Sequence, residues 1–439
     1  MESDILRRIK PTPAQDKKVA QTASELTELV VAEARKAKAH VEPMLVGSVA
    51  KGTHLKDPDI DLFMLFTEST PLEELKDKGL EIGRRIVKGR EHYAQHPYVR
   101  GMFKGFQVDL VPAYRIRDTR SKMSAVDRTP FHTEFVKKNL KKDQRDEVRL
   151  LKRFMKGIEC YGAEAKVEGF SGYLCELLVM RFGTFRGVLE AAKEWKVGEA
   201  LELPDHPGSE FSEPLTFVDP VDSKRNVASA VALETLVRFI LACREYLASP
   251  SMKFFFPVER AVWDPDKAKD VAGKRLGNLV AVTFPKLDLI DDVVYPQLRK
   301  SLAGISALLE RADFEVEKST VHVDGETHLL VELQSISLSD DKKHRGPPVN
   351  SENVSSFLAK WNSLGMSEPF VEAGRWYVVI KRKYPRADDL LNAKLADAPL
   401  GKDVKRQGGF EVESGKALLA ERHLAVLTHH FDERMPWQR

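Results

Sequence analysis

The chain has 439 residues, of which 42% are hydrophobic and 31% are charged, a balance typical of a folded globular protein of two to four domains rather than of a disordered one. The net charge of +3 is too small to indicate a class of partner. Since no apolar run approaches the length needed to cross a bilayer, and residues 1–15 are charged without an apolar core, we expect no membrane span and no secretory signal.

Three cysteines, Cys160, Cys175 and Cys243, lie in helix-like surroundings. Their odd number and wide spacing argue against a disulfide framework and against a Cys-x-x-Cys metal site. We therefore predict buried, reduced thiols in a cytoplasmic protein.

The first strong pattern is an amphipathic helix over residues 16–40, with its apolar side chains on one face. A short apolar run then ends at Val46, and Gly47-Ser48 follows it. A turn at this point offers backbone N–H groups and a hydroxyl that suit phosphate oxygens.

Residues 59–66 predict a strand that enters a core, because polar and apolar residues first alternate and the run then becomes wholly apolar. Asp59 and Asp61 lie two apart and share one face of this strand, while Ile60 and Leu62 face the other way. A solvated pair at a strand end is the ordinary interpretation of such a triplet. The functional one is a Mg²⁺ site, since paired carboxylates repel each other unless a cation lies between them.

A second amphipathic helix over 72–89 is followed by two strand-like runs, 97–103 and 106–114, which join at Lys104-Gly105. This pattern predicts a hairpin that places Asp109 on a strand beside the Asp59 strand. Gly47-Ser48, the Asp-x-Asp triplet and a third carboxylate on a neighbouring strand together resemble the nucleotidyltransferase superfamily of the polymerase beta type. The order of elements suits a small mixed α/β palm.

The next segments are rich in polar and basic side chains. Residues 124–132 predict a hydrogen-bonding loop in which His132 is either a histidine at a helix start or a site residue. Eight cations follow within 137–153. They form a solvated helix face or a surface for polyphosphate or RNA backbone.

Residues 170–182 predict a helix capped by Ser171 or Gly172. Farther on, 217–226 predicts a polar turn that caps a long helix over about 226–248. Arg225 and Asn226 at this turn are either surface residues or side chains suited to reading the edge of a base.

The last third alternates strand-like and helical segments. We predict strands over 313–323, 327–338 and 375–382 and a helix over 353–361. The basic clusters at 342–345 and 381–386 are solvated loops by default, and Trp376, Tyr377 and Tyr384 beside them make a nucleic-acid face the alternative. Pro347-Pro348 suggests a loop that is ordered only by a partner.

Several longer motifs together resemble the archaeal, class I CCA-adding enzyme over nearly the whole chain. They are 46–48, 59–61, 94–99, 124–132, 147–152, 161–164, 169–176, 218–228, 254–255, 291–292, 295–298 and 374–377. The resemblance implies an α+β multidomain fold. Its parts are a polymerase-beta-like catalytic head over 1–140, a helical neck over 141–252 that completes the nucleotide pocket, and an α+β body and tail over 253–439 that bind tRNA.

The same resemblance implies template-independent addition of C, C and A to the 3′ end of tRNA from CTP and ATP, with release of pyrophosphate. Asp59, Asp61 and Asp109 would be the catalytic residues and the ligands of two Mg²⁺ ions. The residues implied in nucleotide binding are Gly47, Ser48, Lys51, Thr129, His132, Lys152, Tyr161, Arg225 and Asn226. A homodimer is one oligomeric state that the sequence leaves open. The chain departs from the family pattern at Asp59, where relatives have Glu, and at Lys51, where some have Arg.

Three alternatives share part of this pattern. A poly(A) or oligoadenylate polymerase would have the same carboxylates but use ATP alone. An RNA-binding protein with an inactive palm would release no pyrophosphate. An antibiotic-modifying nucleotidyltransferase would not need a basic, aromatic C-terminal third.

Overall fold

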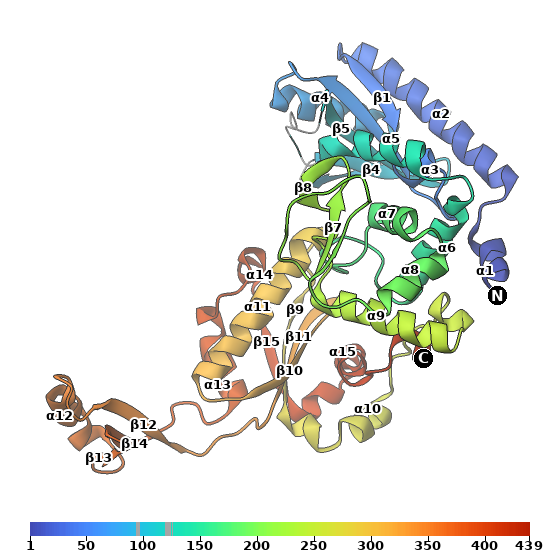
Figure 1. Ribbon diagram of the computed structural model, residues 1–439. Coiled ribbons are helices and arrows are strands. Elements are labelled where there is room, and N and C mark those ends of the chain that lie inside the picture. The colour runs from blue at the N-terminus through green and yellow to red at the C-terminus, as the bar shows by residue number, and fades with distance from the viewer. Residues whose placement is uncertain (94–96, 119–123, 125) are drawn as a thin grey trace. The chain divides into compact units, whose positions relative to one another are not determined.

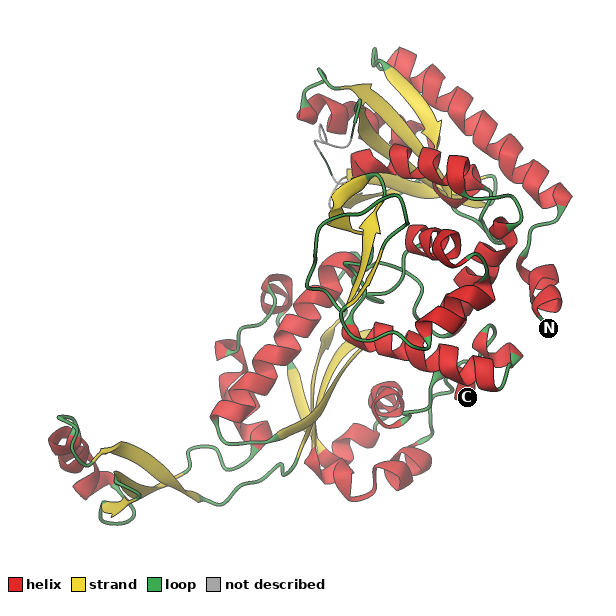
Figure 2. Ribbon diagram, in the orientation of Figure 1, coloured by secondary structure: helices red, strands yellow, loops and turns green. Residues whose placement is uncertain are grey.

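The chain forms two compact units in the computed structural model, which describes residues 1–93, 97–118, 124 and 126–439 (Figure 1). Unit 1 comprises Met1–Arg260, Ile290–Asp292 and Arg434–Arg439. Unit 2 comprises Ala261–Leu289 and Val293–Glu433. Both units mix helices and strands, so the α+β class expected from the sequence is confirmed (Figure 2).

A five-stranded mixed sheet is the framework of the N-terminal part of unit 1. Its strand order is β1-β2-β5-β4-β3, with β2 and β5 parallel and the other neighbours antiparallel. The strands are β1 (Val41–Leu45), β2 (Ile60–Thr67), β3 (Arg90–Tyr93), β4 (Pro97–Phe103) and β5 (Phe106–Arg115). The predicted hairpin is confirmed, because β4 and β5 pair across the turn at Lys104-Gly105.

Two helices, α2 (Pro13–Lys36) and α4 (Leu72–Ile86), cover one face of this sheet. The Thr12 hydroxyl accepts from the Gln15 amide in a capping box and Pro13 begins the helix, so α2 starts and ends a few residues earlier than the pattern predicts. Ile60 and Leu62 belong to the core under these helices, whereas Phe63 packs on the opposite face. The predicted alternation along β2 is therefore confirmed.

Helices α1 (Glu2–Ile9) and α3 (Gly47–Lys51) and a largely helical second part complete unit 1. The helices of that second part are α5 (Thr129–Asn139), α6 (Gln144–Gly157), α7 (Gly172–Phe182), α8 (Phe185–Ala192) and α9 (Leu233–Ala248). They share one core that includes Leu151, Phe154, Leu177 and Phe239. The predicted cap of α7 is confirmed, since the Ser171 hydroxyl accepts from the Leu174 amide at 3.1 Å.

Two local predictions in this part are wrong. The predicted loop 124–132 ends in helix, because α5 begins at Thr129. The helix predicted over about 226–248 is confirmed as α9 but begins later, at Leu233. The polar turn predicted at 217–226 is instead a hairpin of β7 (Leu215–Asp219) and β8 (Asp222–Asn226), which forms a small sheet with β6 (Glu199–Leu201). The apolar run at 215–218 is buried as a strand, and the chain must turn back along it before α9 begins at Leu233.

Unit 2 is built on a four-stranded sheet in the order β10-β11-β9-β15. The strands are β9 (Leu279–Pro285), β10 (Val316–Val323), β11 (Glu326–Leu333) and β15 (Glu411–Ser414). Alternate residues of β9 enter two separate cores, Val280 and Val282 in one and Leu279 and Ala281 in the other. Helices cover both faces: α10 (Pro265–Ala272), α11 (Asp291–Arg311), α13 (Ala387–Lys394), α14 (Lys402–Gln407) and α15 (Glu421–Phe431).

A small three-stranded sheet, in the order β12-β14-β13, carries helix α12 (Val354–Leu364). Its strands are β12 (Asp341–Pro348), β13 (Phe370–Glu372) and β14 (Arg375–Lys381). The interpretation of 342–348 as loop is wrong, since Lys342, Lys343 and His344 pair in register with β14. This strand carries almost no apolar side chains, so hydrophobic periodicity could not identify it.

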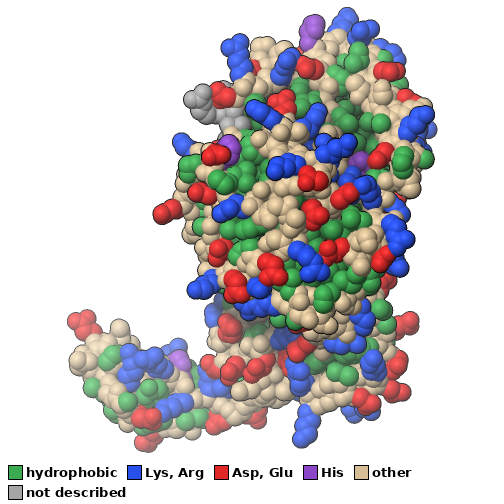
Figure 3. All heavy atoms as spheres, turned by 45° about the vertical axis from the view of Figure 1, so that its right-hand side comes forward, with side chains coloured by type: hydrophobic (Ala, Val, Ile, Leu, Met, Phe, Trp, Pro, Cys, Tyr) green, Lys and Arg blue, Asp and Glu red, His purple; other side chains and the backbone are tan. Residues whose placement is uncertain are grey.

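Charges of both signs are interspersed over the face of the molecule in Figure 3, as the small net charge suggests. The three cysteines are buried and form no disulfide, as predicted. Within the described ranges, no helix has the length and hydrophobicity required for a membrane span.

Candidate active site

Three carboxylates come together on the sheet face that α2 and α4 leave free. Asp61 on β2 and Asp109 on β5 are direct partners in the parallel register, and Asp59 lies immediately before β2. Burial, with the negative charges of Asp109 and Asp59 beside it, raises the pKa of Asp61 to about 7. Burial also raises the pKa of Asp59. Concentrated negative charge of this kind favours a bound cation.

Arg100 is the neighbour of these acids that the sequence analysis missed. It lies opposite Asp109 in the β4/β5 hairpin, and its Nε and Nη2 donate to both Asp109 carboxylate oxygens at 2.7 and 2.6 Å. The hydrogen bond to Asp109 raises the pKa of Arg100 above its ordinary value. The sequence indicates this pair, because a two-residue turn at Lys104-Gly105 places residue 100 across from residue 109.

The turn between β1 and α3 approaches the acids so closely that only glycine fits at its start. Gly47 has a φ of +69°, and a Cβ built there would lie 2.0 Å from Asp61 Oδ2. Ser48 follows at the same wall of the site. The Gly47-Ser48 turn thus borders the carboxylates.

A buried cluster of charges supports the other wall. The Glu176 carboxylate accepts from Lys51 Nζ at 2.7 Å, from Thr53 Oγ1 at 2.6 Å and from Lys152 Nζ at 3.1 Å. Burial alone would raise the pKa of Glu176, but the charges of Lys152 and Lys51 lower it to about 2. Glu176 was not predicted as a site residue, although an acid among Leu174, Leu177 and Leu178 of an apolar helix was a signal for it.

These groups line one cavity of about 320 Å³ within unit 1. Eight of the predicted site residues border it: Gly47, Ser48, Lys51, Asp59, Asp61, Asp109, Lys152 and Tyr161. Arg100, Lys156, Tyr173 and Glu176 line it as well. Burial lowers the pKa of the Lys156 ammonium and raises that of the Tyr161 hydroxyl, as expected of polar groups held in a recess.

Two of the other predicted residues, His132 and Arg225, contact Asp219 at the end of β7. Its carboxylate accepts from His132 Nε2 at 2.9 Å, from Arg225 Nη1 at 2.8 Å and from the Tyr173 hydroxyl at 3.2 Å. The rings of His132 and Tyr173 stack at 4.1 Å. Because Tyr173 also lines the cavity, this cluster adjoins the carboxylate site. Asp219 was not predicted.

Thr129 and Asn226 lie outside the lining of the cavity. Thr129 begins α5, one turn before His132. The Asn226 side chain is buried and bonds backbone: it donates to Leu215 O and accepts from the amides of Phe217 and Ala228. These contacts fix the β7/β8 hairpin that carries Arg225. Residues 94–96 and 125 of the family-like motifs lie outside the described residues.

The carboxylates supply the negative charge that Mg²⁺ needs, but they are not arranged as a set of metal ligands. Among the described residues, no group of three or more His, Cys, Asp or Glu side chains is assembled as metal ligands. Both Asp109 oxygens accept from Arg100, so that, of the three predicted acids, Asp59 and Asp61 have no ion pair within the described residues. Hard oxygen ligands and excess negative charge are what Mg²⁺ requires.

Comparison with known families divides the chain into three matches. Residues 30–132 match the nucleotidyltransferase domain, 146–256 the second domain of tRNA nucleotidyltransferase, and 275–415 the C-terminal domain of CCA-adding enzyme.

Relatives with the same description cover almost the full length. The CCA-adding enzyme of Methanosarcina acetivorans is 42% identical over 93% of this chain and 92% of its own. That of Methanosarcina barkeri is 40% identical over the same shares, and that of Thermoplasma acidophilum is 36% identical over 92% of each chain. The resemblance found in the motifs is confirmed, and the chain belongs to the family of CCA-adding enzymes.

Proposed function

We propose that this chain adds cytidine, cytidine and adenosine to the 3′ end of tRNA, with CTP and ATP as the nucleotide donors. The observation that carries the proposal is the joint presence of full-length similarity to CCA-adding enzymes and of three acids on one sheet face beside the Gly47-Ser48 turn. Membership of the family indicates the substrates, and the arrangement of the three acids supports the reaction chemistry.

The reaction transfers one nucleotide at a time. The 3′ oxygen of the RNA forms a bond to the α-phosphorus, and the bond from that phosphorus to the pyrophosphate oxygen breaks. Asp59, Asp61 and Asp109 would hold two Mg²⁺ ions, which supply positive charge that lowers the pKa of the 3′-hydroxyl and neutralises the leaving pyrophosphate. Arg100 orients Asp109 through its two hydrogen bonds.

The remaining residues would bind and select the nucleotide. The Ser48 hydroxyl and the backbone of its turn would hold the triphosphate, with Lys51, Lys152 and Tyr161 beside them. Arg225 offers a fork of donors suited to cytosine and adenine. It reaches the nucleotide from the Asp219 cluster, where His132 and Thr129 would lie near the ribose and phosphates.

The decisive experiment incubates the purified protein with Mg²⁺, tRNA lacking its CCA end and single labelled nucleotides. We expect incorporation of C from CTP and then of A from ATP, with one pyrophosphate released for each addition. Incorporation of A alone would instead identify a poly(A) or oligoadenylate polymerase, and absence of pyrophosphate would identify an inactive palm.

The Asp109→Ala variant tests the assignment of the acids. We expect it to abolish transfer while CTP binding stays within about threefold of the unmodified protein, because Asp109 acts on the nucleophile rather than on the triphosphate. Binding is measured by equilibrium dialysis. Transfer retained by this variant would refute the role of Asp109.

The domain borders 1–140, 141–252 and 253–439 also remain proposals, and the three family matches support them. A cytoplasmic location is supported by three buried cysteines without a disulfide. Light scattering of the purified chain tests whether it forms a homodimer, which the sequence leaves open.

A further inference from the structure

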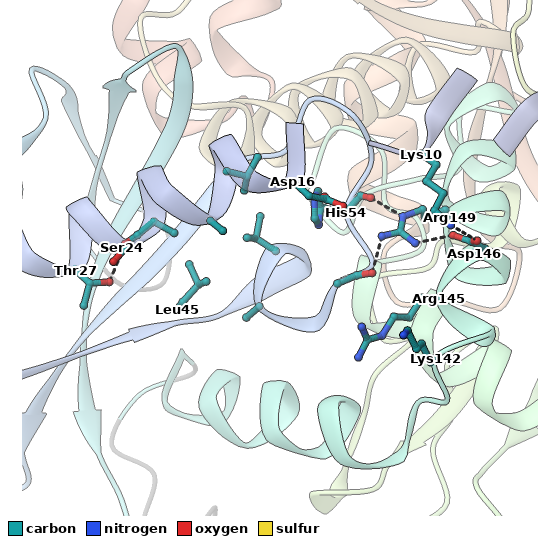
Figure 4. A pocket seen from close by; sticks show the side chains of 16 residues that line it. Lys10, Asp16, Ser24, Thr27, Leu45, His54, Lys142, Arg145, Asp146 and Arg149 are labelled. Atoms are coloured by element: carbon teal, nitrogen blue, oxygen red, sulfur yellow. Dashed lines mark hydrogen bonds and ion pairs between the residues drawn. The ribbon is translucent and has the colours of Figure 1, made fainter. Parts of the chain in front are cut away.

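A second and larger cavity, of about 640 Å³, lies in unit 1 (Figure 4). Helix α2 contributes one wall, with Val19, Ala20 and Ala23. The start of α6 and the residues before it contribute another, with Lys142 and Arg145. The function proposed above uses none of these residues.

The two cavities share a thin wall, formed by α3 and the loop after it. Gly47, Ser48, Lys51 and Thr53 line the carboxylate cavity, whereas Val49, Ala50 and Gly52 line the second one. His54 borders both. The second cavity therefore lies directly behind the phosphate-binding turn.

Both acids of the second cavity already have cationic or imidazole partners. Asp146 accepts from Lys10 at 2.6 Å and from Arg149 at 2.7 Å. Asp16 lies 3.0 Å from His54 Nε2. Burial lowers the pKa of His54, which disfavours a charge on the imidazole.

Two cations of the cavity have no acid of their own. Lys142 and Arg145 lie side by side at its edge (Figure 4), and the described residues offer neither of them a carboxylate within ion-pair distance. Arg145 Nε is also buried without a hydrogen-bond partner in the described part of the chain. The four cations and two acids of the lining leave two positive charges, which suits one phosphate group.

The opposite wall is mainly apolar, with Ser24 and Thr27 as polar members. Val19, Ala20, Ala23, Leu45 and Val49 line it, and a volume of this size falls within the range of about 300 to 1,000 Å³ that small-molecule sites occupy. A phosphate alone would not need an apolar wall, and an apolar ligand would not need two unpaired cations. A nucleotide matches both walls, since its base and ribose can cover apolar side chains while its phosphate binds cations.

We propose that this cavity is a second nucleotide-binding site, with phosphate on Lys142 and Arg145 and base or ribose on α2. The nucleotide is either free or one unit of an RNA strand, because both present the same chemistry. The site is separate from the catalytic cavity and adds to the function proposed above.

Photo-crosslinking of the full-length protein tests the proposal, with 8-azido-ATP as the free nucleotide and a short single-stranded RNA carrying 4-thiouridine as the strand. Trypsin separates residues 19–35, which report the second cavity, from residues 157–166, which contain Tyr161 and report the catalytic one. We expect labelling of both peptides. If only one of the two probes labels 19–35, the result shows whether the site accepts the free nucleotide or the RNA strand.

The double variant Lys142→Ala/Arg145→Ala should lower labelling of 19–35 at least about tenfold, since charged hydrogen bonds of this kind are each worth about that factor. Labelling of 157–166 should stay unchanged, which also shows that the variant folds. Lys137→Ala/Lys138→Ala removes two exposed cations of the same basic run that do not line the cavity, and should change neither peptide.

Two results would overturn the proposal: no labelling of 19–35 by either probe, or equal labelling of 19–35 in Lys142→Ala/Arg145→Ala. If the alanine variant loses labelling of 157–166 as well, Lys142→Gln/Arg145→Gln keeps most of each stem and decides the question. Excess unlabelled CTP or RNA must also suppress the signal at 19–35 in the unmodified protein, and failure to do so rejects a saturable site.

Discussion

Asp219 and Glu176 are buried carboxylates, and each bonds side chains that the family resemblance assigns to nucleotide binding. Asp219 bonds Arg225 and His132, and Glu176 bonds Lys51 and Lys152. An ionised carboxylate is retained in such surroundings only when cations and hydrogen bonds compensate its burial. These two acids therefore set the orientation of the cationic side chains around the site.

The variant Asp219→Asn keeps the size of the side chain but removes the charge that orients the Arg225 guanidinium. We expect discrimination between CTP and UTP, measured as the ratio of kcat/KM values, to fall by about tenfold, as loss of one charged hydrogen bond predicts. Asp205→Asn, at an exposed position of unit 1, is the control. An unchanged ratio in Asp219→Asn would show that Asp219 does not position Arg225.

The variant Glu176→Gln leaves the Lys51 and Lys152 ammonium groups buried without a carboxylate. Removing one partner of a buried ion pair costs about 3 kcal/mol, so hydrogen exchange of α6 and α7 should become faster at pH 7. Glu190→Gln breaks only an exposed pair with Lys193 and should have little effect.

The loss of stability in Glu176→Gln should depend on pH in a definite direction. The pKa of Glu176 is about 2 in the folded chain against an ordinary value of 4.5, so its contribution to stability is complete above pH 4.5 and is lost as the pH falls toward 2. The difference in free energy of unfolding between the unmodified protein and Glu176→Gln should therefore be constant above about pH 5 and become smaller below it. A gap that narrows above pH 6 would contradict the assignment.

At the scale of elements, the site depends on how closely the β1–α3 turn approaches β2. Gly47 and Gly105 both have positive φ, +69° and +86°, but only at Gly47 would a Cβ meet a neighbour, the Asp61 carboxylate. Alanine substitutions at the two glycines thus distinguish the effect of backbone conformation from the effect of close packing.

We expect Gly47→Ala to lower the rate of nucleotide transfer by about a hundredfold, because displacing Asp61 by about 1 Å misplaces a catalytic group. Gly105→Ala should destabilise the chain by only about 1 kcal/mol through its positive φ and leave transfer unchanged. Single-turnover transfer rates and thermal unfolding are the measurements. Equal rates in the two variants would show that the close approach has no catalytic role.

At the scale of the whole molecule, we expect a cluster of histidines to make unit 2 sensitive to acid. His328 and His423 lie 5.3 Å apart between ring centroids. Their Nε2 and Nδ1 atoms, respectively, are buried without hydrogen-bond partners in the described ranges. Burial, then the charge of His423, lowers the pKa of His328 to about 4, against the opposing effect of Asp324. Unit 2 thus holds an imidazole that is neutral when folded and protonates readily when unfolded.

The sign of the resulting pH effect follows from these pKa values. Between about pH 6.5 and 4 the unfolded chain binds more protons at this position than the folded one, so stability is full above that range and falls as the pH drops through it. We expect limited proteolysis within 293–433 to accelerate from pH 7 to pH 5. The variant His328→Asn should reduce this acceleration, whereas His40→Asn, an exposed change in unit 1, should not.

The elements that the sequence predicted well are those whose pattern is local. The alternation of β2 and the two-residue turn of the β4/β5 hairpin depend on residues a few positions apart, so period and turn chemistry predict them. Two of the interpretations that failed, the loop at 342–348 and the turn at 222–226, concern polar strands. Cross-strand pairing determines their conformation, and the pattern of apolar residues in the sequence does not reveal that pairing.

The sequence by itself determined the family, the catalytic acids proposed for it and the face of β2 on which Asp61 lies, because each depends on motif spacing or on the two-residue period of a strand. Only the tertiary structure decided which charges neutralise one another. Lys51 and Glu176 are 125 positions apart, and His132 and Asp219 are 87 apart. The physical reason is that such pairs form where the folded chain excludes water, and packing of the complete core determines that place.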